Sequence, residues 1–121
     1  MIKIKDILNI IKQDHTFKNI RNISLNDQIS IVRSNDYCKQ LIMLARNSAP
    51  SVVAISECIM DLSSDINNDF RIFSLLLVLS DAGVDEAIEL SRVFAQSTDL
   101  SSSKLIAINI LLKESLYGKH N

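Results

Sequence analysis

Glycine, proline and tryptophan are scarce in this chain. Glycine occurs twice, proline once and tryptophan not at all, and aromatic residues make up 5% of the sequence. Sandwiches and barrels of β-strands need many short strands joined by turns rich in glycine and proline. Because such residues are so few, and because 47% of the residues are apolar, the composition predicts an all-α fold.

The sequence also lacks a long apolar run. No uninterrupted apolar stretch exceeds five residues, as in residues 75–79, whereas a helix that crosses a bilayer needs about 20. The first six residues carry two lysines but no apolar core and no small-residue cleavage site, so they do not resemble a secretion signal. We therefore expect a cytoplasmic protein with no membrane partner. Cys38 and Cys58 fall in apolar helical stretches, which is typical of small buried hydrophobic residues.

Residue sets that carry catalysis or ligate metals are missing as well. There is no C-x-x-C pair, and two glycines are too few for a phosphate-binding loop. A nucleophilic serine or cysteine needs a base held within hydrogen-bond distance. His15 falls outside the helical pattern and His120 is the penultimate residue, so neither is expected to be such a base. We expect no enzymatic activity, no cofactor and no metal site.

What the sequence does contain is helical periodicity. Apolar residues recur at spacings of three and four, as in Ile4, Ile7, Leu8 and Ile11. The pattern predicts a single domain over residues 1–121 with about six to seven helices. Residues 15–19 lose the period and are expected to form a loop or a frayed turn. The helices are expected at about residues 2–14, 24–33, 37–46, 51–62, 69–80, 85–96 and 102–117, with Gly83 and Gly118 as stop signals.

The helical segments repeat with a period of 33 residues. Asn35-Asp36-Tyr37 matches Asn68-Asp69-Phe70, and Ala54-Ile55 matches Ala87-Ile88. Each unit consists of a helix, a short turn, a second helix and a longer polar connection. The first unit is imperfect because residues 16–22 displace its second helix, and the last contains one helix.

In period and apolar pattern, the chain from Asp36 onward resembles the helical-hairpin repeats of HEAT and armadillo proteins. The resemblance implies a short stack of antiparallel helical hairpins in which neighbours share one continuous core. The period also matches ankyrin repeats and nearly matches tetratricopeptide repeats, but the T-P-L-H signature of the former and the tryptophan-bearing signature of the latter are absent. The alternative is a plain helical bundle whose self-similarity arose by chance.

Charge is distributed unevenly along the chain, although the formal net charge is only −1. Residues 1–50 contain eight basic and four acidic residues, whereas residues 51–103 contain two basic and nine acidic residues, and residues 104–121 three basic and one acidic. An acidic middle therefore lies between two basic ends. In a stack, the second helices of the hairpins lie on the same side. We expect their acidic side chains to form one face that binds a basic protein, through Glu57, Asp61, Asp65, Asp85, Glu86 and Glu89.

These features give one leading hypothesis of function and two alternatives. The leading hypothesis is an immunity protein or antitoxin that neutralises a toxin, most plausibly a nuclease, because nuclease active sites are typically basic. The first alternative is a helical scaffold, an adaptor or an oligomer subunit with an apolar interface. The second is nucleic-acid binding by the basic N-terminal half, which the near-neutral charge and the absence of an aromatic stacking pattern disfavour. Its candidate residues are Lys12, Lys18, Arg21 and Arg33.

Overall fold

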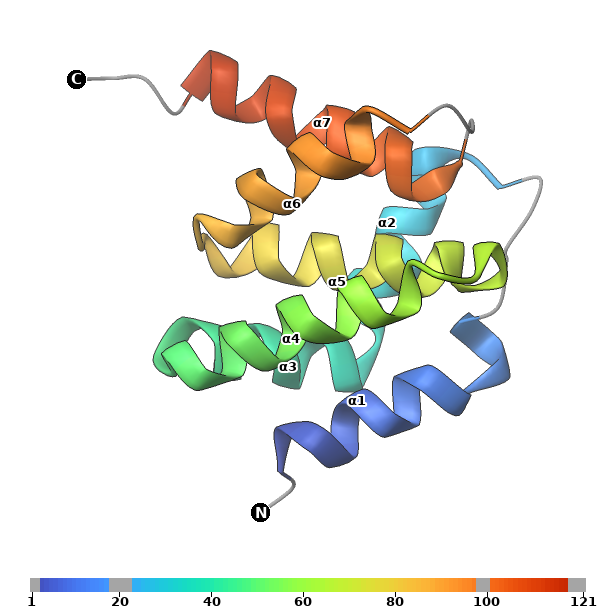
Figure 1. The fold of residues 1–121 in the computed structure, drawn as a ribbon, viewed down its shortest axis with the longest axis vertical. Coiled ribbons are helices and arrows are strands. Elements are labelled where there is room, and N and C mark those ends of the chain that lie inside the picture. Colours follow the sequence, from blue (N-terminus) through green and yellow to red (C-terminus); the bar gives the residue numbers. More distant parts are fainter. Residues whose placement is uncertain (1–2, 18–22, 98–100, 118–121) are drawn as a thin grey trace.

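The computed structural model describes residues 3–17, 23–97 and 101–117. Within these ranges it contains seven α-helices, two short turns of 3-10 helix and no strand (Figure 1). The all-α fold with six to seven stacked helices that the sequence predicts is confirmed. The α-helices are α1 (Ile4–Gln13), α2 (Leu25–Ser34), α3 (Asp36–Asn47), α4 (Ala49–Leu62), α5 (Asp69–Ala82), α6 (Glu86–Ala95) and α7 (Ser102–Tyr117), and the 3-10 turns are η1 (His15–Phe17) and η2 (Ile66–Asn68).

Local capping explains where several helices begin and end. Ser24 caps α2, because its hydroxyl accepts a hydrogen bond of 3.1 Å from the amide of Asp27. Pro50 lies in the first turn of α4, where its missing N–H leaves no helical hydrogen bond unmade. Gly83 ends α5 with a φ of 73°, a left-handed conformation that side chains with a Cβ adopt only at a cost.

The helices stack along the long axis of the molecule, with α1 at one end and α7 at the other (Figure 1). The first helices of successive hairpins form one layer, in which α3 contacts α5 and α5 contacts α7. The second helices form another layer, in which α4 contacts α6. Helix α1 packs against both α3 and α4 and so closes its end of the stack.

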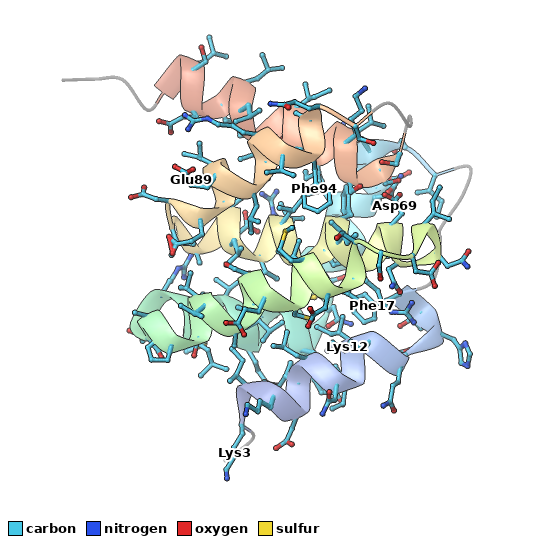
Figure 2. All side chains as sticks on the ribbon, viewed as in Figure 1. Lys3, Lys12, Phe17, Asp69, Glu89 and Phe94 are labelled. Atoms are coloured by element: carbon cyan, nitrogen blue, oxygen red, sulfur yellow. The ribbon has the colours of Figure 1, made fainter. Side chains whose placement is uncertain are left out.

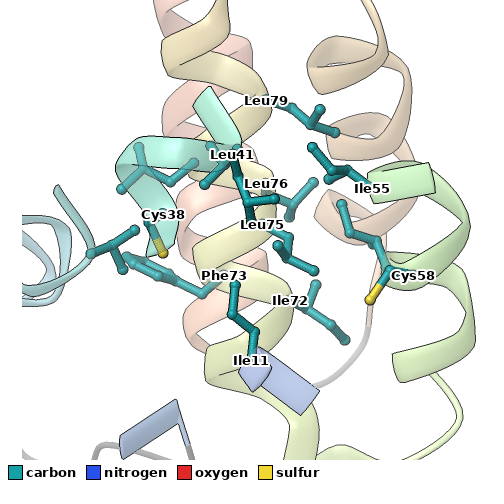
Figure 3. Packing of buried hydrophobic residues seen from close by; sticks show 14 of the residues in the cluster. Ile11, Cys38, Leu41, Ile55, Cys58, Ile72, Phe73, Leu75, Leu76 and Leu79 are labelled. Carbon is teal, nitrogen blue, oxygen red and sulfur yellow. The ribbon is translucent and has the colours of Figure 1, made fainter. Parts of the chain in front are cut away.

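Helix α5 is the centre of the core. Every residue from Phe70 to Leu79 is buried, because α5 contacts α2, α3, α4, α6 and α7. Figure 3 shows its side chains between those of α3 on one side and those of α4 on the other. The densest apolar run of the sequence therefore lies where neighbouring helices cover every face of one helix.

The first repeat differs from the others in the position of its second helix. Helix α2 contacts α3, α5 and α7, so it lies across the layer of first helices. Its apolar face meets that layer through Val32, which is buried, and Ile29, which is partly buried. The sequence indicated that this helix is displaced, but it did not indicate the surface to which it moves.

The structure of residues 15–17 agrees with the loop or frayed turn expected at residues 15–19. Residues 15–17 form η1, and Phe17 is 2% exposed. Its ring stacks on Phe70, with ring centroids 6.3 Å apart, and Phe70 stacks on Phe73 at 5.3 Å. The turn thus adds an aromatic side chain to the core and fixes the end of α1 against α5. Lys18 and Asn19 lie outside the described residues.

Candidate functional site

The six acidic residues that the sequence selects come from two helices and the segments beside them. Glu57 and Asp61 lie on α4, and Asp65 precedes η2. Asp85 immediately precedes α6, and Glu86 and Glu89 lie in its first turn. Five of the six are exposed, and Glu86 is partly exposed.

On α4 the acidic pair is on the outer face because the apolar period fixes the inner one. Val52, Ile55, Ile59 and Leu62 are buried at spacings of three and four. Glu57 and Asp61, one turn apart, therefore point outward. The same outer face carries Val53 and Met60, which are 53% and 48% exposed.

On α6 the acids occupy the beginning of the helix. The macrodipole favours negative charge there, which is sufficient to explain Glu86 without any partner. Glu89 projects into solvent (Figure 2) and is 3.7 Å from Arg92. Both side chains are more than half exposed, so water and salt screen this ion pair and leave it weak. Val93 is exposed beside them.

The two acidic groups lie on the same layer of the molecule but are staggered along it. Helices α4 and α6 run in the same direction (Figure 1). Glu57 and Asp61 lie in the second half of α4, whereas Asp85 and Glu89 lie at the start of α6. By the 33-residue period, Glu57 corresponds to Leu90, not to an acid. The acidic surface is therefore two offset clusters with exposed apolar side chains on the same helices.

Two other acids of the middle segment are used inside the fold. Both Asp69 carboxylate oxygens accept hydrogen bonds from the first turn of α7, from the amide of Ser102 at 2.9 Å and from the amide and hydroxyl of Ser103 at 3.1 and 2.6 Å. Asp69 thus caps α7 from the neighbouring repeat. The ninth acid of the segment, Asp99, lies outside the described residues.

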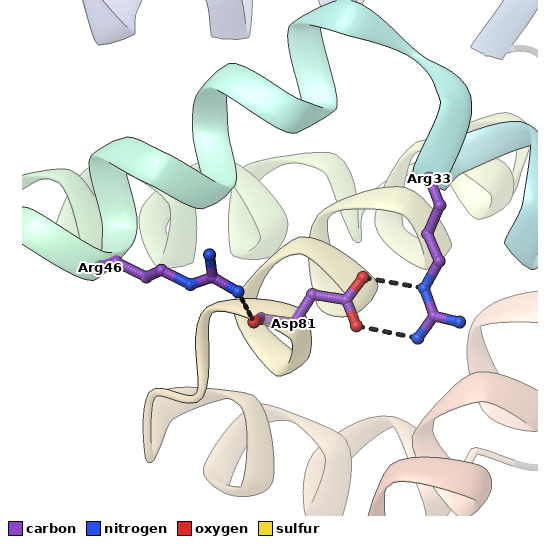
Figure 4. Close-up of polar contacts among 3 residues, drawn as sticks. All are labelled: Arg33, Arg46 and Asp81. Atoms are coloured by element: carbon purple, nitrogen blue, oxygen red, sulfur yellow. Dashed lines mark hydrogen bonds and ion pairs between the residues drawn. The ribbon is translucent and has the colours of Figure 1, made fainter.

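Asp81 joins three helices at the end of α5 (Figure 4). Its carboxylate accepts two hydrogen bonds from Arg33 of α2, at 3.0 and 2.9 Å, and its carbonyl accepts one from Arg46 of α3 at 2.9 Å. The hydrogen bonds to Asp81 raise the pKa of the Arg33 guanidinium. Because two basic side chains engage it, Asp81 adds little to the acidic surface.

Arg71, one of the two basic residues of the middle segment, is directed inward. It is 5% exposed and donates to the carbonyls of Ile11 (2.8 Å) and Asp14 (3.1 Å) at the end of α1. It also donates to the Asn68 side chain at 3.0 Å. Sequence reasoning missed this role, although a charged residue inside a long buried apolar run was a signal. Arg92 is thus the basic residue of residues 51–97 that remains on the surface.

The described residues offer little reactive chemistry. Burial raises the pKa of the Cys38 thiol to about 12 and also raises that of Cys58, so both stay protonated near neutral pH. No cluster of three or more potential metal ligands occurs among the described residues. An open polar hollow of about 590 Å³ lies between α1 and η2, with Lys12, His15 and Arg71 on its wall. Asp65 lines this hollow too, and its carboxylate accepts a hydrogen bond of 2.9 Å from the amide of Asn67.

Comparison with protein-family models, with curated proteins and with solved structures finds no match to this chain. None of the described helices combines the length and apolar character that a membrane span requires.

Proposed function

We propose that this chain is a cytoplasmic protein without catalytic activity that binds and inhibits a basic protein, as an immunity protein or antitoxin does with a nuclease toxin. One observation carries the proposal. Six acidic side chains remain at the surface of α4, α6 and the segments before α6 and η2, and Arg92 is the one basic residue on the surface of these elements. Basic side chains of neighbouring helices border two of the acids, Lys12 beside Asp65 and Lys113 beside Asp85.

The acids would act mainly on the encounter with the partner. A surface of one sign attracts a partner of the opposite sign and orients it before contact, and salt weakens the effect. A nuclease groove is basic because it binds phosphates, so carboxylates spaced along two helices can occupy it in their place. The exposed Val53, Met60 and Val93 then supply apolar contact area beside the charges.

A charge-reversal experiment tests this proposal. The tagged full chain captures its partner from lysate of the source cell at low salt, and the identified partner is then purified. We expect the association rate constant at low salt to fall by about tenfold or more in the triple variant Glu57→Lys, Asp61→Lys, Glu89→Lys. The matched control makes the same change of charge at exposed positions away from this surface, Asp6→Lys, Asp27→Lys and Asp36→Lys, and should slow association much less than the acidic reversal does. Association unaffected by the acidic reversal, or independent of salt, contradicts the proposal.

A second candidate function is a helical scaffold or oligomer subunit with an apolar interface. The observation that favours it is the exposed apolar face of α7, where Leu112 and Leu116 are 57% and 66% exposed. Under this function, apolar substitutions on α7 weaken capture of the partner as well as self-association, and the acidic reversals weaken neither.

A further inference from the structure

Helix α7 has apolar side chains on two faces. Ile106, Ala107 and Ile110 are buried against the rest of the stack. The opposite face carries a stripe of apolar residues at spacings of three and four, and these side chains are exposed to solvent. They are Leu105 (39% exposed), Ile108 (37%), Leu112 (57%) and Leu116 (66%). The described residues contain ten exposed large hydrophobic side chains, and these are four of them. A helix that is apolar all round is normally covered all round.

The repeat shows what usually covers this stripe. One period earlier, Leu105, Ile108 and Leu112 correspond to Ile72, Leu75 and Leu79 of α5. Those three side chains are 4%, 0% and 0% exposed. Figure 3 shows them facing Ile55 and Cys58 of α4, a helix of the second layer. The same positions of the repeat are thus core in α5, and on α7 no described helix covers them. What fits there is another helix with an apolar face.

We propose that the occupant is α7 of a second copy of this chain, packed antiparallel across a two-fold axis. The opposite end of the stack is not a suitable partner, because the outer face of α1 consists of exposed polar and charged residues such as Lys5, Asp6 and Asn9. Of the described helices, α7 is the one with a continuous exposed apolar stripe. A two-fold contact brings this stripe against its own copy and closes the assembly at two chains.

Charge on α7 sets the direction of the pair. The stripe itself carries no charged residue, and Lys104 flanks its first position. The Lys104 ammonium donates a hydrogen bond of 2.7 Å to the Ser97 carbonyl, so its charge stays at the N-terminal end of α7. Side-by-side parallel helices would place the two N-terminal ends together, each with this charge and the positive end of its helix dipole, which is destabilising. In an antiparallel pair with Ile108 opposite Leu112 of the second copy, the two Lys104 residues lie at opposite ends of a helix about 24 Å long.

The size of the stripe sets the strength of the contact. A strip about 17 Å long and about 10 Å wide is small beside the roughly 800 Å² that each partner contributes to a standard interface. The dimer is therefore reversible and depends on concentration. Oligomerisation at this face leaves the acids of α4 and α6 outside the contact between the two α7 stripes.

Sedimentation equilibrium of the full chain over a range of concentrations tests the dimer. We expect a monomer–dimer equilibrium whose dissociation constant rises about tenfold or more in Ile108→Lys and in Leu112→Lys, because each buries an unpaired charge in the contact. Both side chains are exposed in the single chain, so circular dichroism and the melting temperature, measured at concentrations below the dissociation constant, should match those of the unmodified chain. Met43→Lys, at a 63% exposed position on α3, is the matched control and dimerises normally. A chain that is monomeric at every concentration overturns the proposal, as does unchanged dimerisation of Leu112→Lys.

Cross-linking tests the antiparallel register. The double variant Ile108→Cys, Leu112→Cys should form disulfide-linked dimers on mild oxidation, whereas Cys38 and Cys58 are buried and protected. Leu105→Cys should stay unlinked, because antiparallel packing separates the two thiols by about 15 Å along the helix. Efficient cross-linking of Leu105→Cys overturns the antiparallel arrangement. The acidic triple variant should dimerise as the unmodified chain does, so failure of the dimer and failure of the acidic surface are distinguishable.

Discussion

The two ends of the helical stack differ in the chemistry of the face that they expose to solvent. The outer face of α1 is polar, with Lys5, Asp6 and Asn9 exposed on it. Lys3 projects into solvent beside the first turn of α1 (Figure 2). The outer face of α7 carries an apolar stripe. Arrays of stacked repeats need a polar outer face at each end to remain soluble as single molecules. The α1 end meets this requirement, and the α7 end meets it only when something covers it.

Both ends are nevertheless fixed to the core by neighbouring residues of α5. The Arg71 guanidinium binds carbonyls at the C-terminal end of α1, and the Asp69 carboxylate binds amides at the N-terminal end of α7. Each charge has the sign that the adjacent helix dipole favours. Attachment to the core is therefore similar at the two ends, and the difference lies in their outer faces.

The largest expected effect comes from one substitution made at equivalent positions of two repeats. Leu79→Ala empties a fully buried site and should lower the free energy of unfolding by about 3 kcal/mol. Leu112→Ala, one period later, removes a side chain that is 57% exposed and should change it by roughly 0.5 kcal/mol or less. Chemical denaturation at low protein concentration measures both values. Equal losses would show that the α7 stripe is already covered within one chain.

The next largest loss of stability is expected when the hydrogen bonds that hold α1 to α5 are removed. Arg71→Met keeps much of the side-chain volume but leaves the carbonyls of Ile11 and Asp14 without their donor, which should cost about 2–3 kcal/mol. Amide hydrogen exchange should then quicken more in α1 than in α7. Arg92→Met, at an exposed site, is the control and should stay within about 0.5 kcal/mol. If α7 loses more protection than α1, Arg71 does not act on the α1 end.

A smaller loss of stability is expected when the cap at the N-terminal end of α7 is removed. Asp69→Ala removes the acceptor of the Ser102 and Ser103 amides and should cost about 1–2 kcal/mol, as loss of a helix cap does. Exchange should quicken in the first turn of α7, while α1 stays protected. Asp85→Ala is the matched control, because Asp85 makes no side-chain cap hydrogen bond to α6. A melting temperature equally lowered by both variants would contradict the capping role of Asp69.

The smallest change in stability is expected from a variant whose two ends both carry apolar residues. Lys5→Leu with Asn9→Leu places two apolar residues on the outer face of α1 and should change the unfolding free energy by about 0.5 kcal/mol or less. Light scattering should then detect species larger than a dimer, because both ends would associate. Lys5→Gln with Asn9→Gln keeps the face polar and should leave the mass unchanged. A mass that stays the same in the leucine variant would show that polarity of the α1 face is not what prevents association there.

Sequence reasoning located most of the helices because their signals are local. Ser24, Gly83 and the bounds of α7 follow from capping residues and apolar spacing. The position of α2 depends on which surface of the stack is still open, and no local pattern encodes that. Phe17 was missed because a single turn is too short to show a period.

In the candidate site too, some features follow from local sequence patterns and others depend on how the helices pack. Exposure of Glu57 and Asp61 follows from the period of α4, so the sequence could predict it. The stagger between the acids of α4 and α6 depends on how two helices pack, which the sequence does not show. The inward direction of Arg71 likewise depends on the end of α1, which is 57 residues away from it at Asp14.

The position of α2 has a consequence for unfolding. In an ideal array each repeat touches only its neighbours, so the ends can fray while the middle persists. Helix α2 spans α3, α5 and α7 and thereby couples repeats that would otherwise be independent. Loss of any one of them removes a partner of α2 and, through it, support for the others. The chain should therefore melt in a single cooperative transition, with coincident curves from different probes.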